Sequence, residues 1–360
     1  MAENISRRRA LGFAAKSAGV AGAATVAMSV NPAMAGAATP SSPRPPVAPN
    51  DWITIASAQG DQTTEIQNAL TECAAMGGGI VYLESGSFDI SSTLRVGANV
   101  ILMGAGASTR LRAIGSFPWM IEFDESSFAS ALKDMRLLGS SSAGGVNIVT
   151  AGTGGFSGND AYVLIENVYI HNVRRNGVRV GELIMGFGTR EVRLHNVVVL
   201  SAQSHGILFP GVDSILSNCT VAGSGGDGFL ISGGNNRLTG CKAFFNTGAG
   251  ITVNGSRGQL SACQAQDNRG DGFKIVNADD VSLSACGADS NQIVGIRIQN
   301  CEGVTFSSAS SFSRGGRFVQ RYGVRIQDSS NSRITGVSRN NETNLNVVRS
   351  PTVDTSGLLS

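Results

Sequence analysis

The sequence predicts an all-β protein that folds as a right-handed parallel β-helix, a solenoid with rungs of about 22 residues. A short strand pattern recurs seven times, with a glycine followed by inward apolar residues at the first and third positions: Gly177-Val-Arg-Val, Gly206-Ile-Leu-Phe, Gly228-Phe-Leu-Ile, Gly250-Ile-Thr-Val, Gly272-Phe-Lys-Ile, Gly295-Ile-Arg-Ile and Gly323-Val-Arg-Ile. Successive glycines lie 29, 22, 22, 22, 23 and 28 residues apart. A second strand precedes the first six, marked by an apolar residue 12 positions earlier: Ile165, Leu194, Leu216, Leu238, Leu260 and Leu283. Two strands per repeat with turns between them describe one rung of such a solenoid.

Residues 51–110 are expected to form the entry to the solenoid. Thr63 or Thr64 can cap the start of a helix that runs through Cys73 and ends at Gly77-Gly78-Gly79. This short N-terminal capping helix is needed because the first rung would otherwise expose its apolar end and an unpaired strand edge to water. Strands are expected to follow at 80–83, 85–90 and 100–106.

This entry resembles the opening of the pectate-lyase-like β-helix superfamily. Four segments carry the resemblance, in the order Gly60-Asp61, Glu65-Ile66-Gln67-Asn68-Ala69, Gly77-Gly78-Gly79-Ile80-Val81-Tyr82-Leu83 and Gly86-Ser87-Phe88. The superfamily includes polysaccharide lyases, glycoside hydrolases, mannuronan C5-epimerases and phage tailspikes. The resemblance therefore implies a polysaccharide partner, and a homotrimer is considered as the assembly. It specifies the fold and not the reaction, because these glycine and helix residues do no chemistry.

The rest of the chain is expected to form one domain. The β-helix is assigned to 51–340 and a polar C-terminal tail or cap to 341–360, because the rung pattern fades after Ile334. Glycine-rich or basic insertions interrupt the repeat at 139–145, 152–158, 181–188 and 313–321. Insertions on a solenoid often frame its binding face. The alternative is surface variation without function.

The N-terminus resembles an export signal. Ser6-Arg7-Arg8-Arg9-Ala10-Leu11-Gly12 is similar to the bacterial twin-arginine signal, and Ala33-Met34-Ala35 fits a cleavage site after a weakly apolar stretch. We expect residues 1–35 to be a removable signal peptide and residues 36–50, rich in proline and serine, to be a linker. The protein would then be periplasmic or extracellular. The alternative is a basic arm before a soluble helix.

Composition excludes several classes of function. Charged residues make up 15% of the chain and the net charge is +2, so no strong field attracts nucleic acid. Aromatic residues, at 6%, are too few for base-stacking platforms. Beyond the signal, no stretch is long and apolar enough to cross a membrane. Neither a nucleotide-binding glycine motif nor closed metal-site spacing is present, and we expect no metal and no cofactor.

Four cysteines recur with the rungs, three residues after each rung's leucine: Cys219, Cys241, Cys263 and Cys286. Neighbouring rungs place Met135, Val168, Val197, Ala309 and Val337 in the same slot. A slot shared with apolar residues is an interior stack, in which cysteine acts as a small hydrophobic residue. We therefore expect free buried thiols. The alternative is a disulfide between adjacent rungs, whose spacing does not exclude one.

Matching positions of successive rungs stack into columns with a step of about 4.8 Å. The outward column two residues after each glycine places Lys274, Arg297 and Arg325 on three consecutive rungs. Neighbouring cations at this spacing repel by about 1 kcal/mol in water, and an overlying anion would relieve the repulsion. We therefore predict that these residues bind carboxylates or sulfates of a glycan. The alternative is a solvated basic edge with Asp271 and Asp328 as local partners.

The column directly before each glycine holds His205, Asp227, Asp271 and Tyr322. His205 and Asp227 occupy adjacent rungs within hydrogen-bonding reach, an arrangement suited to proton transfer. Asp271 lies two rungs beyond Asp227, roughly 10 Å away, and is assigned with Tyr322 to substrate binding. The alternative is that these residues are turn formers.

Two other groups are candidates for proton transfer or for plain surface positions: His171 with Tyr169, Arg174 and Arg175, and His195 one rung from Glu166.

Two branches of the superfamily have signatures that this chain matches in part. Tyr322-Gly323 is similar to the start of the epimerase signature Tyr-Gly-Phe-Asp-Pro-His but lacks its Asp and His. Ser204-His205-Gly206 is similar to the Gly-His-Gly turn of polygalacturonase-like hydrolases, without matching acidic residues before it. Lyases of this fold can use Arg or Lys as the base, which is compatible with the row of cations.

The sequence therefore predicts an exported β-helix that acts on an acidic polysaccharide as a lyase or an epimerase. Both reactions remove the proton α to a uronate carboxylate, and both need cations to stabilise the resulting enolate. His205 oriented by Asp227, or one of the arginines, would move the proton. The alternatives are a non-catalytic glycan-binding or cell-surface scaffold protein and a glycoside hydrolase.

Overall fold

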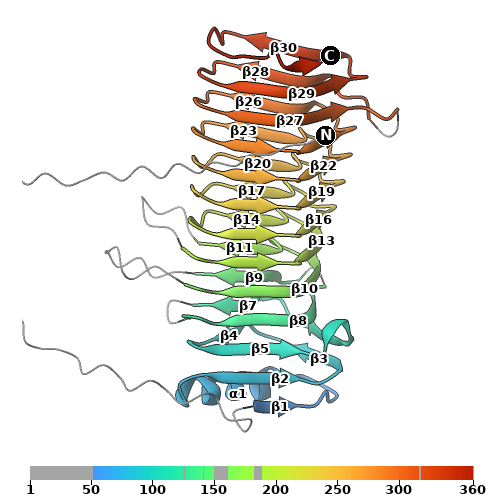
Figure 1. Ribbon diagram of the computed structural model, residues 1–360. Helices are drawn as coiled ribbons and strands as arrows, with labels where there is room; N and C mark the ends of the chain where they lie inside the picture. Colours follow the sequence, from blue (N-terminus) through green and yellow to red (C-terminus); the bar gives the residue numbers. More distant parts are fainter. Residues whose placement is uncertain are drawn as a thin grey trace, which may run out of the picture. The chain divides into compact units, whose positions relative to one another are not determined.

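The computed structural model describes residues 52–124, 127–140, 142–149, 161–181, 189–315 and 318–359. They form a parallel β-helix of stacked rungs, which runs from α1 at the blue end to β30 at the red end (Figure 1). The expected signal peptide (1–35), the linker (36–50) and the insertion at 152–158 lie outside the described residues, as does nearly all of the insertion at 181–188.

Each rung contributes one strand to sheet B, where neighbouring strands are parallel. In stacking order, the sheet contains β4 (Leu94–Val96), β7 (Trp119–Phe123), β9 (Gly144–Ile148), β11 (Val178–Val180), β14 (Ile207–Phe209), β17 (Phe229–Ile231), β20 (Ile251–Val253), β23 (Phe273–Val276), β26 (Val294–Gln299), β28 (Tyr322–Gln327) and β30 (Thr343–Val348).

Sheet A receives the other strands, usually two per rung. They are β1 (Trp52–Ile55), β2 (Gly79–Leu83), β3 (Gly86–Ile90), β5 (Val100–Gly104), β6 (Thr109–Ala113), β8 (Ala131–Leu138), β10 (Leu164–Val173), β12 (Arg193–His195), β13 (Val198–Ala202), β15 (Ile215–Ser217), β16 (Thr220–Ala222), β18 (Arg237–Thr239), β19 (Lys242–Phe244), β21 (Gln259–Ser261), β22 (Gln264–Gln266), β24 (Ser282–Ser284), β25 (Gly287–Asp289), β27 (Thr305–Phe312), β29 (Arg333–Arg339) and β31 (Leu358–Leu359).

The predicted leucine column is confirmed. Leu194, Leu216, Leu238, Leu260 and Leu283 are in register on consecutive rungs and at most 2% exposed. Between the two sheet A strands of these rungs, a residue with positive φ turns the chain, as at Asn196 (φ 51°) and Asn218 (φ 55°). Asparagine tolerates this left-handed conformation better than other side chains do. The 22-residue period therefore sets both the core and its corners.

The cysteine column is also interior, and its four thiols are free and buried. The prediction that Val337 belongs to the same interior slot is wrong. A register shift in the pairing of β27 with β29 places Gly336 opposite Ala309, and Val337 is exposed. Two residues of β27 but only one of β29 lie between the aligned pairs Phe306–Ile334 and Ala309–Gly336, so counting three positions from Ile334 leads to the outer face.

A second interior ladder, made of polar side chains, runs along the corner before sheet B, and the sequence analysis missed it. Each member accepts a hydrogen bond from the backbone N–H of the member before it: Ser224 to Asn246, Asn246 to Asn268, Asn268 to Asn291 and Asn291 to Gln320. These four acceptors are fully buried. The ladder satisfies backbone groups that would otherwise be buried without partners.

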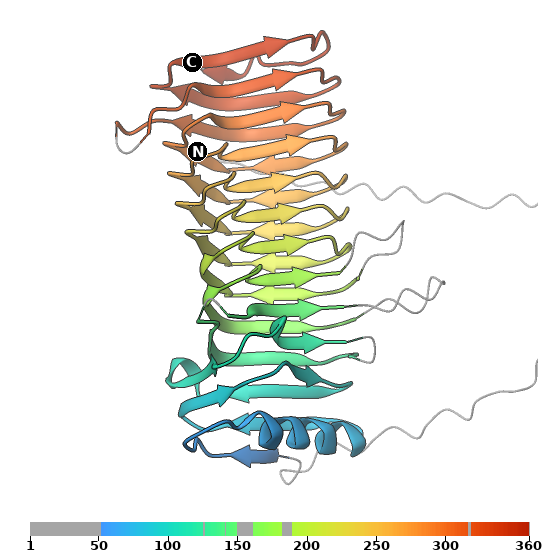
Figure 2. The same ribbon diagram turned by 180° about the vertical axis from the view of Figure 1, so that it is seen from behind.

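The capping helix α1 (Thr63–Ala75) begins where predicted and lies across the end of the β-helix (Figure 2). It packs Ile66, Leu70 and Cys73 into the core. Neither predicted threonine is the N-cap, which is Gln62, and the Asp61 carboxylate accepts the Thr63 N–H at 2.9 Å. No helix in the described ranges has the length and hydrophobicity that a membrane crossing requires.

Residues 341–359 continue the stack beyond the expected end of the repeat. Strand β30 pairs with β28, and β31 pairs with β29. The rung pattern fades in the sequence because the side chains of β30 are only partly buried. This last rung covers the end opposite α1.

Candidate functional site

The predicted row of cations is in register on sheet B. Lys274 on β23 pairs with Arg297 on β26, which pairs with Arg325 on β28 (labelled in Figure 1). We call these three residues the basic row. All three side chains are partly buried and belong to the outward positions of their strands.

The central cation of the basic row is already neutralised. The Arg297 guanidinium binds the Asp271 carboxylate at two points, with Nε 2.5 Å from Oδ2 and Nη2 3.1 Å from Oδ1. Asp271 is 5% exposed. The expected row of three cations facing an anion is therefore corrected to two, because a fork of this geometry satisfies both charges. Asp271 positions Arg297 and is itself too enclosed to be a main substrate contact.

Arg325 lies over an aromatic ring at the edge of the sheet. Its guanidinium carbon is 5.2 Å from the centroid of the Tyr322 ring, and that of Arg321 is 5.4 Å from the same ring. Nη2 of Arg325 donates to Gln327 Oε1 at 3.2 Å, while its Nε is buried and has no hydrogen-bond partner. Among the described residues, no carboxylate pairs with Arg325 or with Lys274.

The predicted pair of His205 and Asp227 does not form an imidazole–carboxylate contact. The backbone N–H of Asp227, and not its carboxylate, meets His205, donating to Nδ1 at 3.0 Å. The Asp227 Oδ1 instead accepts the N–H of Ala249 at 2.8 Å. Nδ1 is therefore an acceptor in this contact, and the carboxylate does not orient the ring as a general base requires.

Two further polar residues directly before a strand of sheet B, Asn176 and Asp271, share this pattern. Asn176 accepts the N–H of His205, and Asp271 accepts the N–H of Val294, in each case one rung further on. These side chains complete the backbone hydrogen bonds of the corner. The turn-forming alternative for this column thus describes what the structure shows.

The structure also separates the two halves of the predicted site. His205 lies three rungs from Asp271 and five from Tyr322, or about 14 Å and 24 Å at the spacing of β-strands. A sugar held at Arg325 is therefore beyond the reach of His205. The assignment of one site to all seven predicted residues is corrected: Asp271, Lys274, Arg297, Tyr322 and Arg325 lie together, and His205 and Asp227 lie apart.

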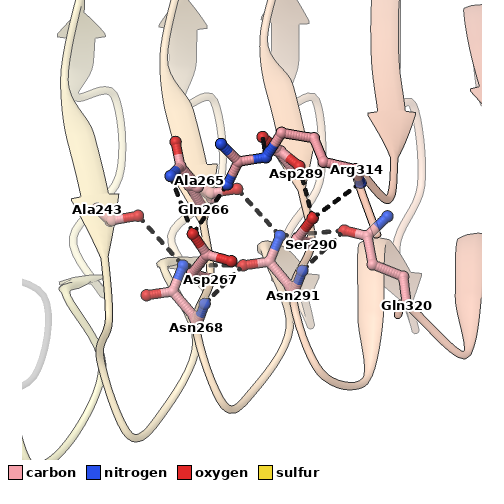
Figure 3. Close-up of polar contacts among 10 residues, drawn as sticks. All are labelled: Ala243, Ala265, Gln266, Asp267, Asn268, Asp289, Ser290, Asn291, Arg314 and Gln320. Atoms are coloured by element: carbon pink, nitrogen blue, oxygen red, sulfur yellow. Dashed lines mark hydrogen bonds and ion pairs between the residues drawn. The ribbon is translucent and has the colours of Figure 1, made fainter. Parts of the chain in front are cut away.

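The basic insertion at 313–321 is anchored to the preceding rungs, which the sequence analysis did not predict. Arg314 bridges two carboxylates on adjacent rungs, with Nη2 2.9 Å from Asp267 Oδ2 and Nε 2.7 Å from Asp289 Oδ2 (Figure 3). Its backbone N–H donates to Ser290 Oγ at 3.0 Å. Tyr322 follows this insertion in the sequence and is itself paired with Val294 and Thr343 on the neighbouring strands.

The candidate pair of His195 and Glu166 is in register, but each side chain has another partner. Glu166 is in register with His195, as expected, but it forms an ion pair with Lys133 at 2.7 Å. His195 Nδ1 lies 2.9 Å from Ser217 Oγ. In the described part of the chain, no three His, Cys, Asp or Glu side chains are grouped closely enough to hold a metal ion.

Comparison with known proteins places the fold. A family model described as "Right handed beta helix region" matches residues 182–316. No curated protein sequence matches the chain.

Three solved structures are similar. The A-module of the mannuronan C-5 epimerase AlgE4 from Azotobacter vinelandii is 16% identical, with 83% of this chain and 94% of that chain covered and a TM-score of 0.58. The enzymatically active domain of tailspike protein 2 from bacteriophage CBA120 is 14% identical (81% and 50% covered, TM-score 0.65). The tailspike gp49 of Acinetobacter baumannii bacteriophage Fri1, a capsular polysaccharide depolymerase, is 15% identical (79% and 60% covered, TM-score 0.51). At these identities the likeness concerns the fold alone. The chain is therefore a right-handed parallel β-helix, the architecture that the family model describes.

Proposed function

We propose that the chain binds an acidic polysaccharide along sheet B, at the basic row and Tyr322. The observation that carries the proposal is that Lys274 and Arg325 have no carboxylate partner among the described residues, although Arg297 between them has one. An anionic chain that follows the stacking direction would meet both cations. The epimerase and the depolymerase of the same fold support a polysaccharide as the ligand class.

The reaction that fits these residues begins with removal of the proton α to a uronate carboxylate. Arg325 or Lys274 would neutralise the carboxylate and stabilise the enolate that forms. Since His205 is too distant, the proton would pass to Tyr322 as its phenolate or to Lys274 as its free amine, and in the second case Arg325 alone would neutralise the carboxylate. Cleavage of the C–O bond to the neighbouring sugar, whose oxygen leaves with a proton from the group that accepted one or from water, then gives an unsaturated lyase product. Return of a proton to the other face of the carbon gives an epimer.

Binding without catalysis is the second candidate function, and one observation favours it. Asp227 and Asp271 are the two carboxylates directly before the glycines. Both already accept backbone N–H groups. Asp271 is also paired with Arg297. The same engagement speaks against a hydrolase that would use these two residues as its acid and base.

Incubation of the purified protein with alginate, pectate and glycosaminoglycans tests the proposal. Ultraviolet absorbance reports the unsaturated product of a lyase, NMR of the product reports epimerisation, and calorimetry reports binding. Exchange of both Lys274→Gln and Arg325→Gln should weaken binding by about 1–2 kcal/mol per lost contact. Arg193→Gln, an exposed cation on sheet A, is the matched control. Affinity that is unchanged in the double variant would remove the site from sheet B.

We further propose that the chain acts outside the cytoplasm, on the strength of its twin-arginine-like segment. Replacing Arg7 and Arg8 by lysine should retain a reporter fused after residue 50 in the cytoplasm. Undiminished export of that reporter would contradict the proposal.

A further inference from the structure

A hollow lies on sheet A, which is a different face from the basic row. Its volume is about 230 Å³, and five side chains from three neighbouring strands line it: Arg136 and Leu138 of β8, Tyr169 and His171 of β10, and Leu200 of β13. Leu138, His171 and Leu200 follow one another in register, and Arg136 is in register with Tyr169. We call this feature the sheet A hollow. Its position on consecutive rungs makes it part of the rigid β-helix.

Two arginines without carboxylate partners stand at one side of the hollow. Arg110 on β6 is in register with Arg136, and both side chains are exposed. Among the described residues neither forms an ion pair, whereas Arg112, two positions along β6, is paired with Asp89 at 2.6 Å. Two guanidinium groups one rung apart repel each other. An anion bound between them would remove that repulsion.

The hollow combines this charge with an apolar floor and an aromatic wall. Leu138 and Leu200 are partly buried, and Tyr169 is 41% exposed. The Arg136 guanidinium lies 5.9 Å from the centre of that ring, so it is held beside the aromatic surface. An aromatic ring and aliphatic side chains fit the C–H face of a sugar, and the guanidinium groups fit its acidic substituent. His171 is a further polar group in the lining, with no described partner of its own.

We propose that the sheet A hollow is a second carbohydrate site, which binds one sugar residue that carries an anionic group. The sugar ring lies against Tyr169, and its carboxylate or sulfate meets Arg110 and Arg136. This site is independent of the proposed site on sheet B. Two sites on different faces allow one protein to hold two polysaccharide chains, or two parts of one chain, with the avidity that multivalent binding provides.

The test uses the full chain with Lys274→Gln and Arg325→Gln in place, so that binding at sheet B does not mask the hollow. The probes are a short oligouronate, a sulfated neutral oligosaccharide of the same length, and its unsulfated parent. Calorimetry should show that Tyr169→Ala weakens binding of the preferred anionic probe by about tenfold. Combined Arg110→Gln and Arg136→Gln should weaken the anionic probe by a similar factor and remove its dependence on salt.

Tyr169→Phe, which keeps the ring, should retain binding, and Lys242→Gln, a cation further along the same outward face, should leave it unchanged. Melting temperatures confirm that each variant is folded.

Preference for the uronate or for the sulfate identifies the anion and supports the proposal either way. The proposal would be overturned if the Tyr169→Ala variant and the double arginine variant bound the probe as tightly as the chain with only Lys274→Gln and Arg325→Gln. It would also be overturned if these variants changed the oligomeric state of the protein and left its sugar affinity unchanged. Failure of both anionic probes to bind the chain with only Lys274→Gln and Arg325→Gln would also overturn it. The difference in binding between the wild-type chain and the chain with Lys274→Gln and Arg325→Gln reports sheet B.

Discussion

Arg297 and Asp271 form a two-point ion pair between neighbouring rungs of sheet B, with 15% and 6% of their side chains exposed. The same carboxylate accepts the backbone N–H of Val294 at 3.1 Å. Asp271 thus holds the central cation of the basic row and the backbone of the next rung at once. Its removal should therefore affect the stability of the fold before it affects any ligand.

Replacing Asp271 by asparagine should lower the free energy of unfolding by about 3 kcal/mol, because Arg297 would be left as an enclosed charge without a partner. Chemical denaturation measures the change. Adding Arg297→Gln to the variant should recover part of the loss, since the uncompensated charge is then gone. Asp280→Asn, at an exposed position, serves as the control and should be close to neutral. Equal stability of Asp271→Asn and the parent would show that the pair contributes nothing.

The sequence predicted the registers of the β-helix because its period determines them. Once Leu194 and Leu216 are known to stack, every outward residue of those rungs is placed relative to its neighbours. Asp271 was considered only as an alternative partner of the basic row, because its contact with Arg297 crosses between two columns and two rungs. The period of the repeat relates only residues that occupy the same position on successive rungs.

The predicted contact between His205 and Asp227 failed for a related reason. Adjacent rungs bring the two residues together, but backbone N–H groups at the corner compete for the same acceptors. Buried or partly buried backbone groups require partners, and the side chains of this column supply them. The interior asparagine ladder had a usable signal: Asn246, Asn268 and Asn291 recur at intervals of 22 and 23 residues. Asparagine at an interior corner with the period of the rungs predicts such a ladder.

Replacing Asn268 by leucine should destabilise the protein by about 2–4 kcal/mol. Asn268 Oδ1 accepts the N–H of Asn246 at 3.0 Å, and Nδ2 donates to the carbonyl oxygen of Ala243 at 3.1 Å. Leucine would leave the buried N–H without an acceptor, at about 1–3 kcal/mol per group. Gln264→Leu, on the exposed face of the same rung, makes a similar chemical change without that loss. Denaturation midpoints that fall equally for both variants would contradict a special role for the ladder.

The interior thiols should be unreactive in the folded protein. Hydrogen bonding with Cys241, followed by burial, raises the pKa of the Cys263 thiol to about 12, although Cys286 acts in the opposite sense. The reactive thiolate is therefore scarce at neutral pH. A thiol reagent at pH 8 should label Cys219, Cys241, Cys263 and Cys286 only after denaturation. Rapid native labelling, or mass-spectrometric detection of disulfides among them, would contradict the free buried thiols.

The same shift predicts the direction of a pH effect on stability. The folded pKa of Cys263 lies above the unfolded value of about 8.5. Its contribution to stability is therefore complete below pH 8.5 or so and is lost as the pH rises toward the folded pKa. Cys263→Val introduces the residue type that occupies the same slot at Val197. Above that pH, the stability of this variant should decline less than the stability of the unchanged protein. An identical decline in both proteins would assign the alkaline loss to other groups.

Arg314 should control the mobility of the segment that leads into Tyr322. Its guanidinium bridges Asp267 and Asp289, and its backbone N–H is held by Ser290, so three contacts anchor the start of the insertion (Figure 3). Because its side chain is 47% exposed, Arg314→Gln should change global stability by no more than about 1 kcal/mol. Hydrogen exchange around residue 314 should nevertheless become faster, because local opening no longer breaks an ion pair. Arg349→Gln removes an exposed pair elsewhere and should leave this exchange unchanged. Exchange at the parent rate in Arg314→Gln would show that the bridge does not anchor the segment.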